Sequence, residues 1–155
     1  MKYLVQSYAV GHSLLLEALA GLSEEELNFK PAPEKWSIKE VIIHVSDGEL
    51  VAVDRMKRVI AEDNPLFFKF DPDLWSGRLH YGALDMQMHL DIFKGLRLSM
   101  VSVLNEIQTA EWDRAGVHNI AGKQTLRDIV VMFTGHIDRH ILQINRNKQA
   151  YQALQ

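Results

Sequence analysis

The stretch "TLRDIVVMFTGHIDRHILQINRNKQAY", residues Thr125–Tyr151, decides the fold expected for this chain. Its apolar residues recur at spacings of three and four, which is typical of one face of an α-helix. Thr125 stands at the N-cap position and Asp128 follows three residues later, where a carboxylate favours the start of a helix. The stretch therefore predicts a long helix with one buried face.

Three more stretches share this period, at about Tyr3–Leu19, Ile38–Ala61 and Ala83–Ile107. The second follows Ser37, and Glu40 three residues later completes a capping box. No stretch shows the alternation of a β-strand. The sequence predicts an all-α fold, a four-helix bundle. On the third helix, the residues expected to face the core are Leu84, Met88, Ile92, Leu96, Val103 and Ile107.

The connection between the second and third helices, Glu62–Gly82, is too long for a tight turn, so we expect one long crossover. We interpret its aromatic residues as a cover for one hydrophobic end of the bundle; a substrate-pocket wall and a dimer contact are the alternatives. These aromatic residues are Phe67, Phe68, Phe70, Trp75 and Tyr81. Residues Ala115–Gln124 are expected to form a loop, and residues 1–155 a single domain.

The composition excludes several classes of protein. The chain of 155 residues has no cysteine, so a metal must be held by histidine, carboxylate or water. Its formal net charge of −3 does not resemble the basic footprint of a nucleic-acid binder. No apolar run approaches the roughly 18 residues of a membrane span. We expect a cytoplasmic protein with a small-molecule substrate and neither a nucleic-acid nor a membrane partner.

Two histidines lie on or beside the apolar face of the fourth helix. His136 and His140 are one turn apart, a spacing that lets two ring nitrogens reach one metal at about 2.0–2.1 Å. The alternative is that they are two core imidazoles. His44 is the best third ligand, because it borders the apolar face of the second helix beside Gly48, where a missing side chain leaves room for its ring. The candidate metal ligands are therefore His44, His136 and His140.

Other polar residues receive weaker assignments. Glu49 falls within the apolar face of the second helix, and we interpret it as a structural partner of an arginine or a helix end; a part in catalysis or metal support is the alternative. Gln143 lies on the ligand side of the fourth helix, and its support of the site stays open. The histidines expected to be exposed rather than ligating are His12, His80, His89 and His118.

Two long stretches carry a family resemblance. "PAPEKWSIKEVIIHVSDGE" (Pro31–Glu49) and "GVHNIAGKQTLRDIVVMFTGHIDRHILQI" (Gly116–Ile144) resemble the DinB-like/YfiT-like superfamily of four-helix metalloproteins. The resemblance covers essentially the whole chain. It implies a divalent metal bound by His44, His136 and His140, with its remaining positions open to water, and frequently a homodimer.

Three histidine ligands suit zinc or nickel first, with iron or manganese as alternatives. Without a cysteine of its own, the protein must use water or an external thiol as nucleophile. The leading hypothesis is an enzyme that transfers a low-molecular-weight thiol to an electrophilic small molecule. The alternatives are a metal-dependent hydrolase, a non-catalytic metal-binding stress-response module, and a protein that binds no metal.

Overall fold

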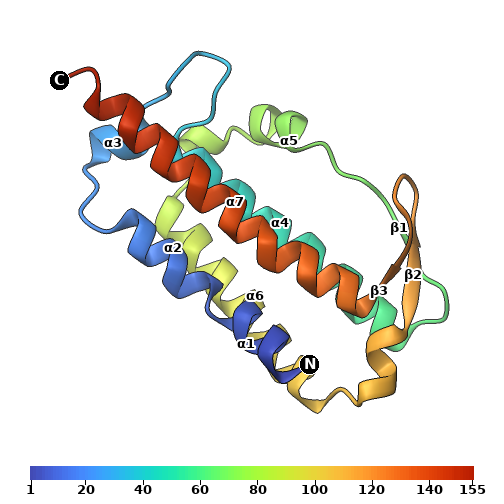
Figure 1. Cartoon of the computed structure of the whole chain (residues 1–155). Helices are drawn as coiled ribbons and strands as arrows, with labels where there is room; N and C mark the ends of the chain where they lie inside the picture. The colour runs from blue at the N-terminus through green and yellow to red at the C-terminus, as the bar shows by residue number, and fades with distance from the viewer.

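Four long helical segments pack side by side in the computed structural model, which describes residues 1–155 (Figure 1). They are the pair α1 (Lys2–Ala9) and α2 (Gly11–Leu19), then α4 (Ile38–Ala61), α6 (Met86–Glu106) and α7 (Leu126–Gln152). The predicted four-helix bundle is confirmed. A short helix α3 (Glu24–Asn28) precedes α4, and none of the helices combines the length and apolar character needed to cross a bilayer.

Capping boxes begin the two helices that carry the candidate ligands; the one at Ser37 was predicted, and the predicted N-cap Thr125 forms the other with Asp128. The Ser37 hydroxyl accepts the Glu40 backbone N–H at 3.2 Å, and the Glu40 carboxylate accepts the Ser37 N–H at 2.8 Å. Thr125 and Asp128 exchange the same two bonds at the start of α7, at 3.1 and 2.9 Å. Each box satisfies N–H groups that a helix end leaves unpaired, so both helices begin at defined residues.

The first segment is not the continuous helix predicted over Tyr3–Leu19, because it breaks at Val10. The Arg97 guanidinium of α6 reaches the break and donates to the Tyr8 carbonyl oxygen at 3.0 Å. Gly11 makes this approach possible, since a Cβ there would collide with the guanidinium. The carbonyl at the break is thus bound by a side chain 89 residues away along the chain.

The long connection between α4 and α6 returns the chain along the whole bundle, so the predicted crossover is confirmed (Figure 1). Gly82, just before α6, lies beside Glu40 at the start of α4. Arg114, just beyond α6, donates to the Val59 carbonyl near the end of α4 at 2.9 Å. The two neighbouring helices therefore run in the same direction. The connection contains β1 (Leu66–Phe67), α5 (Pro72–Arg78) and a 3-10 turn (Tyr81–Ala83).

The prediction of a plain loop at Ala115–Gln124, and of no strand, was wrong. After a 3-10 helix (Thr109–Asp113), β2 (Ala115–His118) pairs antiparallel with β3 (Gly122–Thr125), and β1 adds to β2 in parallel. Gly116 permits this pairing, because a Cβ there would lie 2.7 Å from the Pro65 carbonyl and would also meet the Phe67 ring. The small sheet joins the crossover to the start of α7.

The buried face of α6 differs from the predicted one. Met88 and Ile92 are exposed. The buried residues of this helix are Leu90, Phe93, Arg97, Met100 and Leu104. Their spacings of three and four are those of one helix face, but a charged residue lies at its centre.

A buried ionic cluster surrounds that arginine. Arg97 Nη2 lies 2.5 Å from Glu49 Oε2, and both side chains are 1% exposed. The Tyr8 hydroxyl donates to the other Glu49 oxygen, and burial together with Glu49 raises the pKa of Tyr8. The guanidinium also packs over the Tyr8 and Phe93 rings. The interpretation of Glu49 as the structural partner of an arginine is confirmed.

Candidate metal centre

Three histidines converge between α4 and α7. His44 Nε2 lies 3.2 Å from His136 Nε2, and His140 Nε2 lies 3.0 Å from the same atom. One ring nitrogen from each of the three lies within 4.8 Å of the others. The structure thus brings together all three residues proposed from the sequence as metal ligands.

The three imidazoles are neutral at physiological pH. His44 is 5% exposed, and burial followed by the nearby His140 lowers its pKa to about 3. Burial, followed by the charges of its neighbours, lowers the pKa of His136 to about 2, and burial lowers that of His140. A neutral imidazole keeps a lone pair on one nitrogen, which is the form that binds a metal.

The hydrogen bonds of the ligand rings fit a bound cation. His140 Nδ1 lies 2.9 Å from Gln143 Oε1, an oxygen that can only accept, so the ring proton is on Nδ1 and Nε2 has a lone pair. His136 Nε2 has two imidazole nitrogens close to it, but it carries at most one proton. It can therefore donate a hydrogen bond to only one of them. Ligands of a tetrahedral zinc ion at 2.0–2.1 Å are about 3.3 Å apart, close to the separations found here. Gln143 therefore orients one ring of a site suited to a divalent cation.

Gly48 has a part in the site that differs from the expected one. The sequence suggested that it leaves room beside His44, on its own helix. In the structure the space is filled by the ring from the opposite helix, since a Cβ on Gly48 would lie 3.0 Å from His136 Cε1. Glycine at this position lets α4 and α7 approach with an imidazole between them.

We expect Gly48→Ala to weaken zinc binding about tenfold, as changes beside a ligand typically do, because the His136 ring must shift by a few tenths of an ångström. Competition with a chromophoric chelator measures this affinity. Gly95→Ala on α6 is the matched control, because a Cβ there meets no atom within 4 Å. Equal zinc affinity in the two variants would contradict this role of Gly48.

A pocket of about 280 Å³ opens beside His44 and His136. Its other lining residues are Arg55, Lys69, Phe70, Pro72, His118, Met132, Phe133 and Arg139. The expectation that His118 is exposed was wrong: it is 9% exposed, and its Nδ1 accepts the backbone N–H groups of Ile120 and Ala121 at 3.1 Å. Burial, with Arg55 as a second cause, lowers the pKa of His118.

Sequence reasoning missed Arg55, although a signal for it existed. Arg55 follows His44 by eleven residues and Gly48 by seven, spacings that place all three on one face of α4. His12, His80 and His89 do not take part in the histidine cluster.

Most of the aromatic residues of the crossover form a wall rather than an end cover. A larger pocket of about 990 Å³ lies between α4 and residues 66–79, and Phe67, Phe68, Phe70 and Trp75 line it. Phe67 is also part of the core, whereas the Phe70 ring lies 4.8 Å from Trp75 and 6.2 Å from His44, centroid to centroid. This placement favours the pocket-wall alternative.

Comparisons with known proteins agree with this architecture. The family model of the DinB superfamily matches residues 8–144. A Bacillus licheniformis protein whose name describes a candidate metal-dependent hydrolase is 25% identical over 137 residues, covering 88% of this chain and 78% of that protein. A similarly named protein of Geobacillus thermodenitrificans is 26% identical over 132 residues, covering 84% and 74%.

The solved structure of YfiT from Bacillus subtilis, described as a probable metal-dependent hydrolase with an unusual four-helix bundle topology, has the same fold. It matches with a TM-score of 0.89 at 18% identity, covering 97% of this chain and 87% of that one.

Proposed function

The chain belongs to the DinB superfamily, and from this premise we propose that it is a metal-dependent hydrolase of a small molecule. The observation that carries the proposal is the convergence of three neutral imidazoles at the edge of a pocket. His44, His136 and His140 would hold a divalent cation, zinc or nickel first, with iron or manganese as alternatives. Such a cation supplies Lewis-acid chemistry, polarising a substrate oxygen and lowering the pKa of water toward about 7.

The protein's own residues orient and enclose this site. Gln143 fixes the proton of His140 on Nδ1, which leaves its Nε2 lone pair toward the other two rings. The centroid of the Trp36 ring lies 4.8 Å from that of His44, and the centroid of the Phe70 ring lies 6.2 Å from it. These aromatic contacts restrict the rotation of His44 and exclude water from its sides. The pocket of about 280 Å³ beside the histidines has the size of a small substrate group.

Hydrolysis is tested with tag-free protein whose metal content has been measured by elemental analysis. We expect cleavage of 4-nitrophenyl acetate without added thiol, a loss of activity after chelation, and its recovery with one equivalent of zinc or nickel. If the metal-loaded protein cleaves esters and amides no faster than the uncatalysed reaction, the hydrolase proposal is ruled out. The non-catalytic metal-binding module is then favoured.

Thiol transfer is the second candidate, and one observation favours it. No aspartate or glutamate lines the pocket beside the histidines. A hydrolase commonly uses a carboxylate as general base for water, whereas a thiol ionised by a metal needs none. The same metal-loaded protein, incubated with glutathione and 1-chloro-2,4-dinitrobenzene, distinguishes the candidates: conjugation without ester cleavage supports the transferase.

A further inference from the structure

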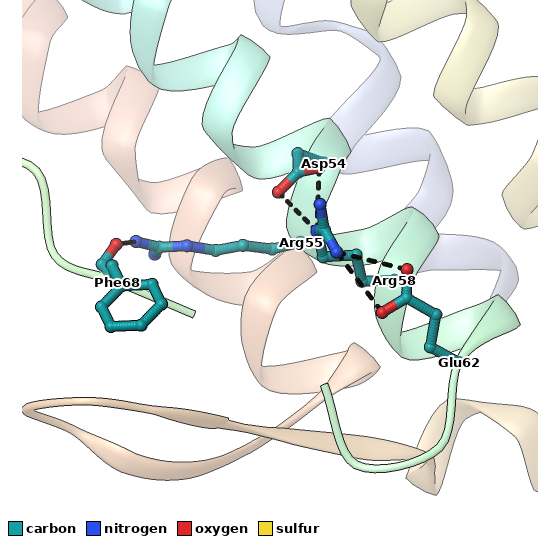
Figure 2. Close-up of polar contacts among 5 residues, drawn as sticks. All are labelled: Asp54, Arg55, Arg58, Glu62 and Phe68. Carbon is teal, nitrogen blue, oxygen red and sulfur yellow. Dashed lines mark hydrogen bonds and ion pairs between the residues drawn. The ribbon is translucent and has the colours of Figure 1, made fainter. Parts of the chain in front are cut away.

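Arg55 on α4 is a buried cation that forms no ion pair; the charge of the neighbouring Asp54 favours it, but the Asp54 carboxylate pairs with Arg58. Its side chain reaches the crossover, where Nη2 donates to the Phe68 carbonyl oxygen at 2.8 Å (Figure 2). The residue is only 6% exposed, and it takes part in no ion pair. Burying a charge without an opposite charge is costly, so the position requires an explanation beyond one carbonyl contact.

The neighbouring Arg58 makes the contrast clear. It is exposed, yet its Nε lies 3.0 Å from both Asp54 oxygens and its Nη1 lies 3.3 Å from Glu62 (Figure 2). Asp54 on α4 and Glu62 just after it therefore pair with the exposed arginine and not with the buried one. The buried guanidinium forms no ion pair and lines both the larger pocket and the pocket beside the histidines.

The rest of that pocket offers donors and positive charge. Lys69 and Arg139 line it, and neither forms an ion pair. His118 also lines it. Because its Nδ1 accepts two backbone N–H groups, its proton is on Nε2, which is therefore a donor. With no carboxylate in the lining, this surface is complementary to an anion.

We propose that this pocket binds a carboxylate or phosphate group of the substrate, with Arg55 as its principal partner and His118, Lys69 and Arg139 around it. The inference rests on the proposed function and adds a substrate class to it: a small anionic molecule whose reacting bond lies close to its charged group. The Arg55 side chain is preorganised for this role, because its Nη2 donates to the Phe68 carbonyl oxygen and its position is therefore fixed.

Calorimetric titration of the metal-free protein tests this, because a carboxylate cannot then bind a metal instead. The probes are succinate and inorganic phosphate, with succinamide as the uncharged counterpart of succinate. We expect at least one of the two anions to bind and succinamide not to bind. Arg55→Gln is expected to weaken anion binding about tenfold or more, as loss of a charge-assisted hydrogen bond does. The matched control Arg58→Gln is expected to change it less than twofold.

Arg55→Gln also removes the bond to Phe68, so its folding is checked by circular dichroism. If it fails to fold, Lys69→Gln and Arg139→Gln replace it. Both side chains are exposed and make no hydrogen bond, and each variant is expected to weaken anion binding about threefold, as partly screened charges do. Unchanged anion binding in these two variants would then overturn the proposal.

Three other results would overturn the proposal: neither anion binds at millimolar concentration, succinamide binds as well as succinate, or Arg58→Gln matches Arg55→Gln. Anion binding without ester cleavage would rule out the hydrolase but leave the anion site standing. Ester cleavage without anion binding would overturn the proposed anion site and leave the hydrolase proposal standing.

Discussion

Replacing His136 with alanine is expected to abolish stoichiometric metal binding. Its Nε2 is the atom that both other imidazoles approach, at 3.2 and 3.0 Å, so its loss leaves only two of the three ligands. A three-ligand site with a total binding free energy on the order of 10 kcal/mol loses about 3 kcal/mol with one ligand, a little over a hundredfold in affinity. Elemental analysis and competition with a chelator measure the loss.

His12→Ala is the control for this variant, since His12 lies outside the cluster. The wild-type protein and the control are expected to gain thermal stability when zinc is added, because zinc binds the folded state. His136→Ala is expected to lose this gain while it folds without metal. One equivalent of tightly bound zinc in His136→Ala would refute the assignment of the three histidines.

Replacing Arg97 with methionine is expected to lower the free energy of unfolding by about 3–5 kcal/mol, because the Glu49 carboxylate then stays buried without its cation. In a chain of this length that corresponds to a fall of about 10 °C in the melting temperature. The exposed pair formed by Arg127 and Asp113 is the control, and Arg127→Met is expected to cost less than about 1 kcal/mol. Urea unfolding measures both.

A double variant separates the lost pair from the isolated charge. Glu49→Gln combined with Arg97→Met leaves no charge in the cluster, so it is expected to be more stable than Arg97→Met alone. If the two substitutions instead destabilise the protein additively, the buried carboxylate is not what makes the single variant unstable.

The helices could be predicted because their signals are local. Capping boxes at Ser37 and Thr125 and an apolar period decide where α4 and α7 begin and which face they bury. The buried face of α6 was assigned wrongly because a charged residue, Arg97, lies in the middle of it and interrupts its apolar pattern in the sequence. That arginine is buried only because Glu49, 48 residues away, neutralises it. The pattern of one helix cannot contain this information.

The strands were missed for a similar reason. β2 and β3 have four residues each, and "AGVH" and "GKQT" lack the apolar alternation of a strand. Their pairing depends on β1, about 50 residues earlier, and on the close fit of Gly116 against Phe67.

The histidine cluster could be found because its residues lie on inward faces of two strongly periodic helices. The cationic pocket beside it could not, because the chain brings it together from four elements. Arg55 comes from α4, Lys69 from the crossover, His118 from the sheet and Arg139 from α7. In the sequence, the one signal for this surface is the spacing of Arg55 from His44, and it was not recognised.

In this fold the candidate metal ligands and one wall of the pockets are carried by different parts of the chain. The three histidines are carried by α4 and α7, whose positions are set by the core. One wall of each pocket is carried by residues 66–79, which connect helices without contributing a ligand. Insertions and substitutions in that segment can therefore remodel the chamber next to the histidines while the cluster itself stays in place. Proteins that share this bundle can therefore differ in the shape of their pockets while the three histidines stay in place.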